Sequence, residues 1–136
     1  MAGGKADTES DKYLDRCFGQ STYTPNATHY LAVYSVAPTN AGGGTEMAGD
    51  TYARIAITNN GTNWPPAADG YKYNGAKLLF AIAGADWGVM VAWALHSAAS
   101  GDHLVRWGQI NYDSGVEILT GDQLAFDIGD LEIREQ

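Results

Sequence analysis

The most distinctive hydrophobic pattern in the chain lies in residues 86–108. The segment 86–96 is apolar at nearly every position, and a small-residue turn at 97–102 joins it to a second extended segment. Because strand side chains alternate between two faces, this pattern predicts a β-hairpin whose first strand has no water-compatible face. Such a strand needs a cover on both sides, and we expect another subunit to supply one of them. The predicted subunit-interface residues are Val89, Met90, Val91, Trp93 and Leu95.

Further extended segments follow one another along the chain, separated by turn residues such as Gly, Pro, Asn and Asp. The predicted strands are 29–36, 51–58, 77–82, 86–96, 103–112, 116–119, 123–128 and 131–133. No second helix is long enough to cross over a parallel sheet. The pattern therefore predicts an all-β fold, an antiparallel β-sandwich with jelly-roll-like character.

The N-terminal region has a different pattern. Residues 1–9 are small and polar, which predicts a flexible arm that is ordered only against a partner. Ser10 is a candidate N-cap for a two-turn helix over 11–18 that ends at Gly19. Its apolar stripe predicts that this helix docks on the domain or on a neighbour, and the stripe consists of Tyr13, Leu14, Cys17 and Phe18. We divide the chain into an arm and docking helix, 1–22, and a single β-sandwich domain, 23–136.

Composition narrows the function classes. The 136 residues are 45% hydrophobic and carry a formal net charge of −8, which disfavours nucleic acid and anionic membranes as partners. No apolar run reaches the length that a transmembrane helix needs. Cys17 is the single cysteine, and we expect it to be a buried small hydrophobe in a protein made in a reducing cytoplasm.

Candidate chemistry is sparse. His96, Asp102 and His103 flank the hairpin turn. A metal site there would lack a dependable third or fourth protein ligand, so we expect these three to be polar turn residues rather than metal ligands. The glycine run 42–44 lacks the Lys-Ser/Thr pair of a phosphate-binding loop. The C-terminal carboxylates follow the pattern of a solvated strand edge, which leaves a hydrolase as a distant third hypothesis. We predict no catalytic residues, no metal and no cofactor.

Aromatic residues exceed what one small core requires, with four tryptophans and eight tyrosines. We expect Trp93 and Trp107 to form a cross-strand pair. The long loop at 63–75 carries Trp64, Tyr71 and Tyr73, which are suited to stacking on a sugar or to anchoring a protein partner. A carbohydrate-binding receptor-recognition module is therefore the alternative function, with a host-surface glycan as its ligand.

Three blocks in a fixed order resemble a family of small phage virion proteins, of the tail-fibre-like or capsid decoration (cement) type. The first runs from Gly19 through Tyr23-Thr-Pro25 and Tyr30-Leu-Ala-Val-Tyr34 to Ala37-Pro-Thr39. The second contains Ala41-Gly-Gly-Gly-Thr-Glu46 and Tyr52-Ala-Arg54, and the third contains Ala85-Asp-Trp-Gly88, Ala98-Ala-Ser-Gly101 and Trp107-Gly108. The stretch 64–74 departs from the family pattern.

The resemblance implies a non-enzymatic structural protein of the virion, synthesised in the host cytoplasm. It implies a homotrimer whose partners are other virion proteins, either the major capsid protein or tail and baseplate proteins. The residues do not decide between head and tail. The implied site is a surface for assembly, with the N-terminal arm reaching toward the particle.

Overall fold

The computed structural model describes residues 3–19, 22–110 and 114–135. Within these residues it has one helix, α1 (Asp7–Cys17), and a series of short strands. The strands are β1 (Gly3–Lys5), β2 (Thr28–Val36), β3 (Thr45–Glu46), β4 (Ile55–Thr58), β5 (Tyr71–Tyr73), β6 (Leu78–Leu79), β7 (Gly88–Met90), β8 (Ala92–His96), β9 (Leu104–Gln109), β10 (Val116–Ile118), β11 (Ala125–Phe126) and β12 (Glu132–Arg134). Their pairings are antiparallel. The predicted all-β antiparallel class is confirmed.

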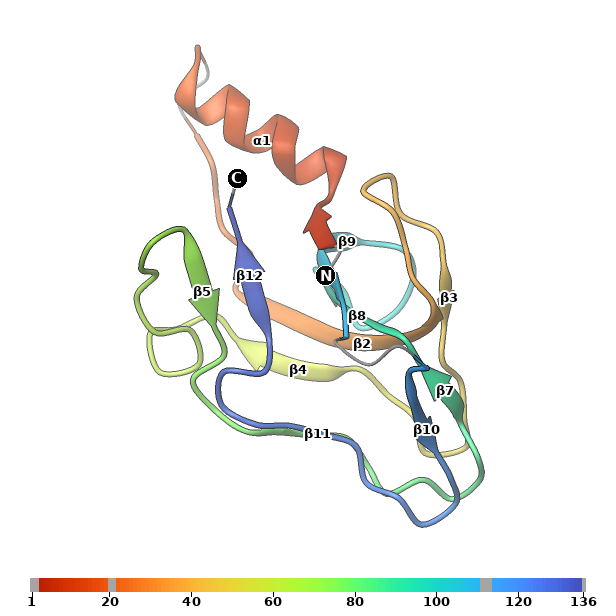
Figure 1. Ribbon diagram of the computed structural model, residues 1–136. Coiled ribbons are helices and arrows are strands. Elements are labelled where there is room, and N and C mark those ends of the chain that lie inside the picture. Colours follow the sequence, from red (N-terminus) through yellow and green to blue (C-terminus); the bar gives the residue numbers. More distant parts are fainter. Residues whose placement is uncertain (1–2, 20–21, 111–113, 136) are drawn as a thin grey trace.

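The first layer is a six-stranded sheet with the order β1-β9-β8-β2-β3, in which β4 also pairs with β2 (Figure 1). The central strand β2 pairs with β4 through its first half and with β3 through its second half. Along its other edge β2 pairs with β8, which places Leu31 opposite Leu95 and Val33 opposite Trp93. Large apolar residues on adjacent strands thus share one face of the sheet.

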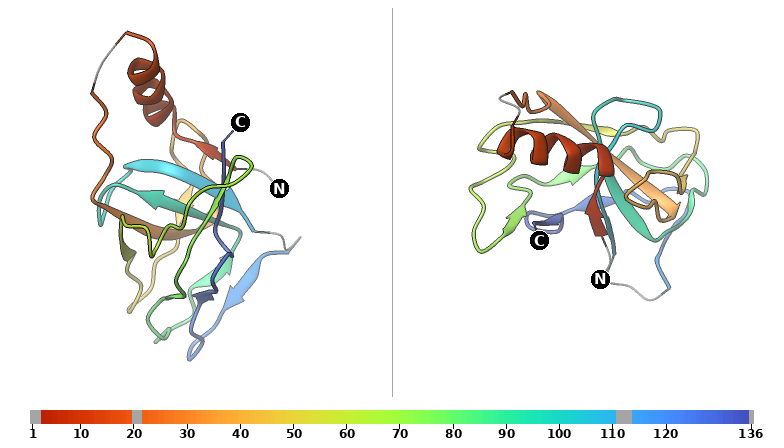
Figure 2. Two further views of the ribbon diagram at one scale, coloured as in Figure 1. Left: turned by 90° about the vertical axis from the view of Figure 1, so that its left-hand side faces the viewer. Right: turned by 90° about the horizontal axis from the view of Figure 1, so that it is seen from above.

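Three two-stranded ribbons, β5–β12, β6–β11 and β7–β10, make the second layer (Figures 1 and 2). In the middle ribbon Leu78 pairs with Phe126 and both are buried, whereas the next pair, Leu79 and Ala125, is exposed. This alternation turns one ribbon face toward the large sheet. The core between the layers includes Leu31, Val33, Trp64, Phe80, Trp87, Trp93, Ile118, Phe126 and Leu131, and the arrangement is sandwich-like.

The predicted long strand at 86–96 is two strands in different layers. β7 pairs with β10 in the second layer, and β8 joins the large sheet between β2 and β9. The change of layer occurs at Val91, whose N–H donates to the Tyr34 carbonyl and whose own carbonyl accepts from Ile110 N–H. A strand that crosses between layers is apolar over its whole length because different parts of it face different neighbours.

Both faces of β8 are covered within the chain itself. Trp93 and Leu95 enter the main core, while Ala92 and Ala94 enter a second cluster on the opposite face of the sheet. That second cluster also contains Ala6, Ala32, Tyr34 and Leu104. One chain therefore covers both faces of β8, and the expected cover of one face by another subunit is not needed for this strand.

The N-terminal segment is ordered rather than a flexible arm over residues 3–9. β1 pairs with β9, and Ala6 N–H donates to the Val105 carbonyl at 3.0 Å. The reason is the free edge of β9, whose backbone groups need partners and obtain them from these residues. Small side chains suit this position, since a Cβ on Gly3 would come within 2.7 Å of the Trp107 carbonyl oxygen.

The helix also differs from the prediction. It begins at Asp7 after Ala6, without a side-chain cap, so Ser10 lies inside it and not before it. Its apolar stripe is exposed, including Cys17, which was expected to be buried. The helix projects from the rest of the molecule (Figure 1), and the part of the chain that the structure describes leaves the stripe exposed. No helix in the described residues has the length and apolarity that a membrane crossing requires.

Candidate functional site

The five predicted interface residues differ in accessibility. Met90, Trp93 and Leu95 are buried in the core, while Val91 is half-buried and Val89 is exposed. The three buried residues contribute stability to the single chain and present almost no surface to a partner. A subunit contact at Val89 and Val91 stays a prediction.

Trp93 and Trp107 do not form the expected cross-strand pair. Trp93 lies opposite Gly108, and a Cβ on that glycine would come within 2.7 Å of the Trp93 ring. Trp107 lies opposite Ala94 on the other face, where its Nε1 donates to Asn40 Oδ1 at 2.9 Å. The register therefore separates the two indoles by the thickness of the sheet.

The loop aromatics are also divided. Trp64 is buried in the main core, whereas Tyr71 and Tyr73 stand on the edge strand β5 with ring centroids 6.4 Å apart and nearly parallel planes. The Arg134 guanidinium lies 4.9 Å from the centroid of the Tyr71 ring. The predicted loop at 63–75 thus contains the strand β5. Pro65 and Pro66 precede this strand, at positions where no hydrogen bond between strands is required.

His96 is a core residue and not a polar turn residue. Its Nδ1 accepts from His103 N–H at 3.1 Å, so the neutral ring carries its proton on Nε2, which lies 2.7 Å from the Tyr34 hydroxyl. Burial, assisted by the nearby Arg54 charge, lowers the pKa of His96 to about 4. The same burial effect raises the pKa of Tyr34 to about 12. This pair remains neutral at physiological pH.

The other two members of the predicted turn cluster have separate roles. Asp102 accepts from the Gly43 N–H at 3.1 Å, and His103 is exposed. No group of three or more His, Cys, Asp or Glu side chains among the described residues has the arrangement to hold a metal ion.

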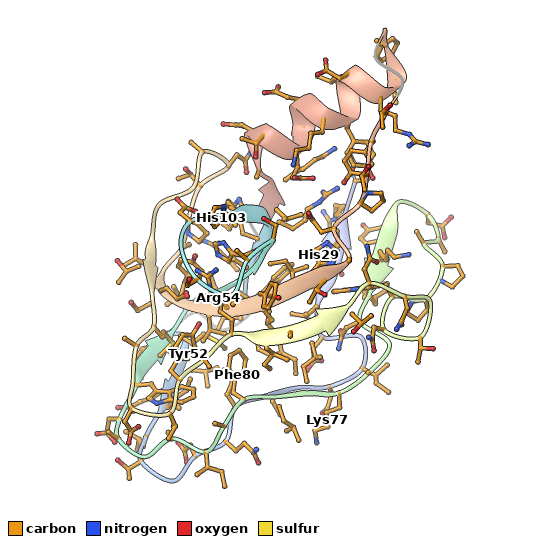
Figure 3. All side chains as sticks on the ribbon, turned by 180° about the vertical axis from the view of Figure 1, so that it is seen from behind. His29, Tyr52, Arg54, Lys77, Phe80 and His103 are labelled. Carbon is orange, nitrogen blue, oxygen red and sulfur yellow. The ribbon has the colours of Figure 1, made fainter. Side chains whose placement is uncertain are left out.

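Arg54 organises the turn at 97–102, and its role was not recognised from the sequence. The guanidinium donates to both carboxylate oxygens of Glu46 and to the backbone carbonyls of Ala98 and Gly101, at 2.7 to 3.0 Å (Figure 3). The predicted strand 51–58 contains Arg54 but does not indicate its partners. Only the fold shows that the hairpin turn closes over it and leaves its side chain largely buried.

A groove with a volume of about 550 Å³ lies between α1 and the strands β1, β9 and β12. One wall is the apolar stripe of the helix, including Leu14, Cys17 and Phe18. The opposite wall includes Trp107 and Ile133. The volume lies within the range of clefts that take a ligand or a short protein segment.

Charged residues lie along the strand wall of this groove. Lys5 and Arg106 each form an ion pair with one carboxylate oxygen of Glu135, at 2.5 Å. Burial raises the pKa of Glu135, but the hydrogen bonds from Arg106 and Lys5 outweigh it and hold the pKa below its usual value. Lys5 also lies 4.2 Å from the centroid of the Tyr13 ring and so connects the wall to the helix.

A smaller hollow of about 210 Å³ continues from the groove toward the core, and it is lined by Tyr23, His29, Trp64 and Lys72 among others. The His29 and Trp64 rings meet edge to face, with centroids 6.1 Å apart. His29 Nδ1 and Trp64 Nε1 are buried and have no hydrogen-bond partner among the described residues. Burial lowers the pKa of His29, so its ring is neutral at physiological pH.

The geometry of the described residues therefore offers surfaces rather than a catalytic constellation: a groove beside an exposed helix and a tyrosine pair on an edge strand. Comparison with curated proteins gives no match. A family model described as Podophage GP4 fiber I protein gp80 matches residues 4–134. This match includes the last two residues of β1, the helix α1 and every strand from β2 through β12, and it confirms the resemblance to tail-fibre-like phage virion proteins. The chain belongs to the Podophage GP4 fiber I protein gp80 family.

Proposed function

We propose that this protein is a non-enzymatic structural component of a phage fibre, located in the virion. The family match over residues 4–134 carries the proposal, because it extends across nearly the whole folded chain and describes a fibre protein. That description favours the fibre over the capsid decoration role that the sequence left open. Tail and baseplate proteins are accordingly the expected partners, in preference to the major capsid protein.

The proposed mode of action is self-association, as a homotrimer, together with attachment to other virion proteins. The exposed apolar side chains of the helix stripe support this mode. Exposed apolar patches on a protein surface commonly mark sites of contact with another protein. Symmetric association is the usual way for a small chain to cover such surface.

Labelling of intact particles tests the location. An antibody against the protein, followed by electron microscopy, is expected to mark the fibres at the tail. Label on the capsid surface would restore the decoration role, and particles without label would overturn the virion assignment. Static light scattering of the purified protein tests the mode of action, and a monomer at every concentration would contradict self-association.

Binding of a host-surface glycan is a second candidate function, and it now depends on Tyr71 and Tyr73 without Trp64. The parallel rings form a stacking surface, with Arg134 and Glu132 on the paired strand as hydrogen-bonding groups. A glycan array with Tyr73→Ala tests it, with Ile82→Ala, an exposed residue after β6, as the matched control. Loss of a glycan signal only with Tyr73→Ala would support the candidate, and an array without any signal would reject it.

A further inference from the structure

The helix α1 is almost entirely uncovered. Glu9 is its only buried residue, while Leu14 is 58% exposed and Phe18, just after the helix, is 78% exposed. An isolated helix of 11 residues is marginal in water. Its described attachments to the rest of the chain include the hydrogen bond from Asp7 N–H to the Asn40 carbonyl at 2.9 Å, the hydrogen bond from Tyr23 to Glu9, and the contacts of Tyr13 with Lys5 and Tyr23.

The uncovered stripe faces a groove that the described residues do not fill. Leu14, Cys17 and Phe18 line one side of the 550 Å³ hollow, and Trp107 and Ile133 line the other. The helix and the strands therefore form two separated apolar walls, and a segment inserted between them would contact both.

The strand wall of the groove and the helix as a whole have opposite net charge, although the helix residues that line the groove itself are uncharged. The strand wall carries the cations of Lys5, Arg106 and Arg134 against two carboxylates, so it is positive in a chain of net charge −8. The helix carries four carboxylates against Lys12 and Arg16, so it is negative. The four carboxylates belong to Asp7, Glu9, Asp11 and Asp15.

A surface with a negative apolar helix beside a positive apolar wall is complementary to a copy of itself. When copies are arranged head to tail in a closed ring of three, the helix of each lies against the strand wall of the next, and opposite charges meet at each contact. We propose that the groove beneath α1 is an interface between copies of this chain, in which each copy inserts the Leu14 and Phe18 edge of its helix into the groove of the next. This inference rests on the proposed self-association and names the surface that carries it.

Cys17 provides a built-in reporter for this interface. It is the single cysteine of the chain, it is exposed, and it lies on the stripe between Leu14 and Phe18. In the proposed interface the thiols of two copies approach each other, so oxidation with diamide should convert them to a disulfide, with the two electrons passing to diamide. The control is the double variant Cys17→Ser, Ser100→Cys, which moves the thiol to the exposed hairpin turn and should give no cross-linked dimer.

Sedimentation equilibrium of the full chain measures the contribution of the stripe. Phe18→Ser is expected to weaken self-association at least tenfold, and Leu14→Lys serves as a second, independent variant. Ile128→Ser is the matched control, because Ile128 is similarly exposed, at 68%, on the second layer. Circular dichroism and a thermal melt confirm that each variant keeps the fold.

The outcomes separate this inference from the proposed function. Oligomers that survive both stripe variants, with no Cys17 cross-link, would overturn the groove interface and leave self-association in place. A monomeric wild type would overturn both, including the case in which the groove binds a different virion protein. Weakening by Phe18→Ser and Leu14→Lys but not by Ile128→Ser, together with the cross-link, would establish the interface.

Discussion

The strand β8 and the helix α1 are both apolar in sequence, but the fold treats them in opposite ways. Every residue of β8 is buried, because β2, β9 and the second layer enclose it. The apolar side chains of α1 are exposed, although the helix follows directly on a strand of the same sheet. The difference shows that an apolar segment indicates residues that favour burial, but not which part of the molecule, or which partner, buries them. In this chain the element whose apolar side chains stay exposed is the helix α1.

The largest expected effect concerns the buried strand β8. Trp93→Ala should lower the free energy of unfolding by about 3 to 5 kcal/mol, because it leaves a cavity in the main core. Urea denaturation measures the loss, and Val89→Ala, an exposed neighbour, should change it by less than about 0.5 kcal/mol. Normal stability of Trp93→Ala combined with loss of oligomers would instead place Trp93 in a subunit interface.

Acid should lower the free energy of unfolding through His96, the last residue of β8. An unfolded histidine has a pKa of about 6.5, and burial lowers the folded value to about 4. Above pH 6.5 the ring is neutral in both states and stability is complete; as pH falls from 6.5 toward 4, the unfolded state binds the proton first and stability declines by about 3 kcal/mol.

Urea denaturation at pH 7.0 and 4.5 measures this decline. His29, whose pKa burial also lowers, adds a loss of the same sign. His96→Phe should therefore reduce the pH dependence without abolishing it. An identical pH dependence in wild type and His96→Phe would show that this ring does not titrate as described.

A smaller effect is expected at Gly108, which makes room for the Trp93 ring. Gly108→Ala should cost about 1 to 3 kcal/mol, because the added Cβ lies within 2.7 Å of the ring and forces it to shift. Gly61→Ala is the control, since an added Cβ there meets nothing within 4 Å. Equal melting temperatures for the two variants would contradict the close packing of Trp93 on this strand.

The smallest effect on the stability of the chain is expected at the exposed helix α1. Leu14→Ser removes an exposed side chain that packs on little of its own chain, so the free energy of unfolding of the monomer should change by less than about 0.5 kcal/mol. Denaturation at a concentration below self-association measures it. A loss above about 2 kcal/mol would mean that the helix stripe is covered within one chain, and the contrast with β8 would fail.

Several features followed from local patterns alone. Runs of β-branched and aromatic residues between turn residues were sufficient to predict the antiparallel all-β class, and ordered motifs such as Tyr30-Leu-Ala-Val-Tyr34 were sufficient to suggest the phage family that residues 4–134 match. The apolar stripe of the N-terminal helix was also visible, because helical periodicity is a property of neighbouring residues.

Other features depend on residues that are distant in the sequence and become visible only in the fold. The free edge of β9 orders Gly3–Lys5, which by composition resembled a flexible arm. The turn at 97–102 buries Arg54, and the change of layer at Val91 divides one apolar segment between two sheets. Local hydrophobicity indicates which residues need to be buried. Which of them become buried depends on the segments that meet across the fold, and the packing of distant strands covers β8 and leaves the apolar side chains of α1 exposed.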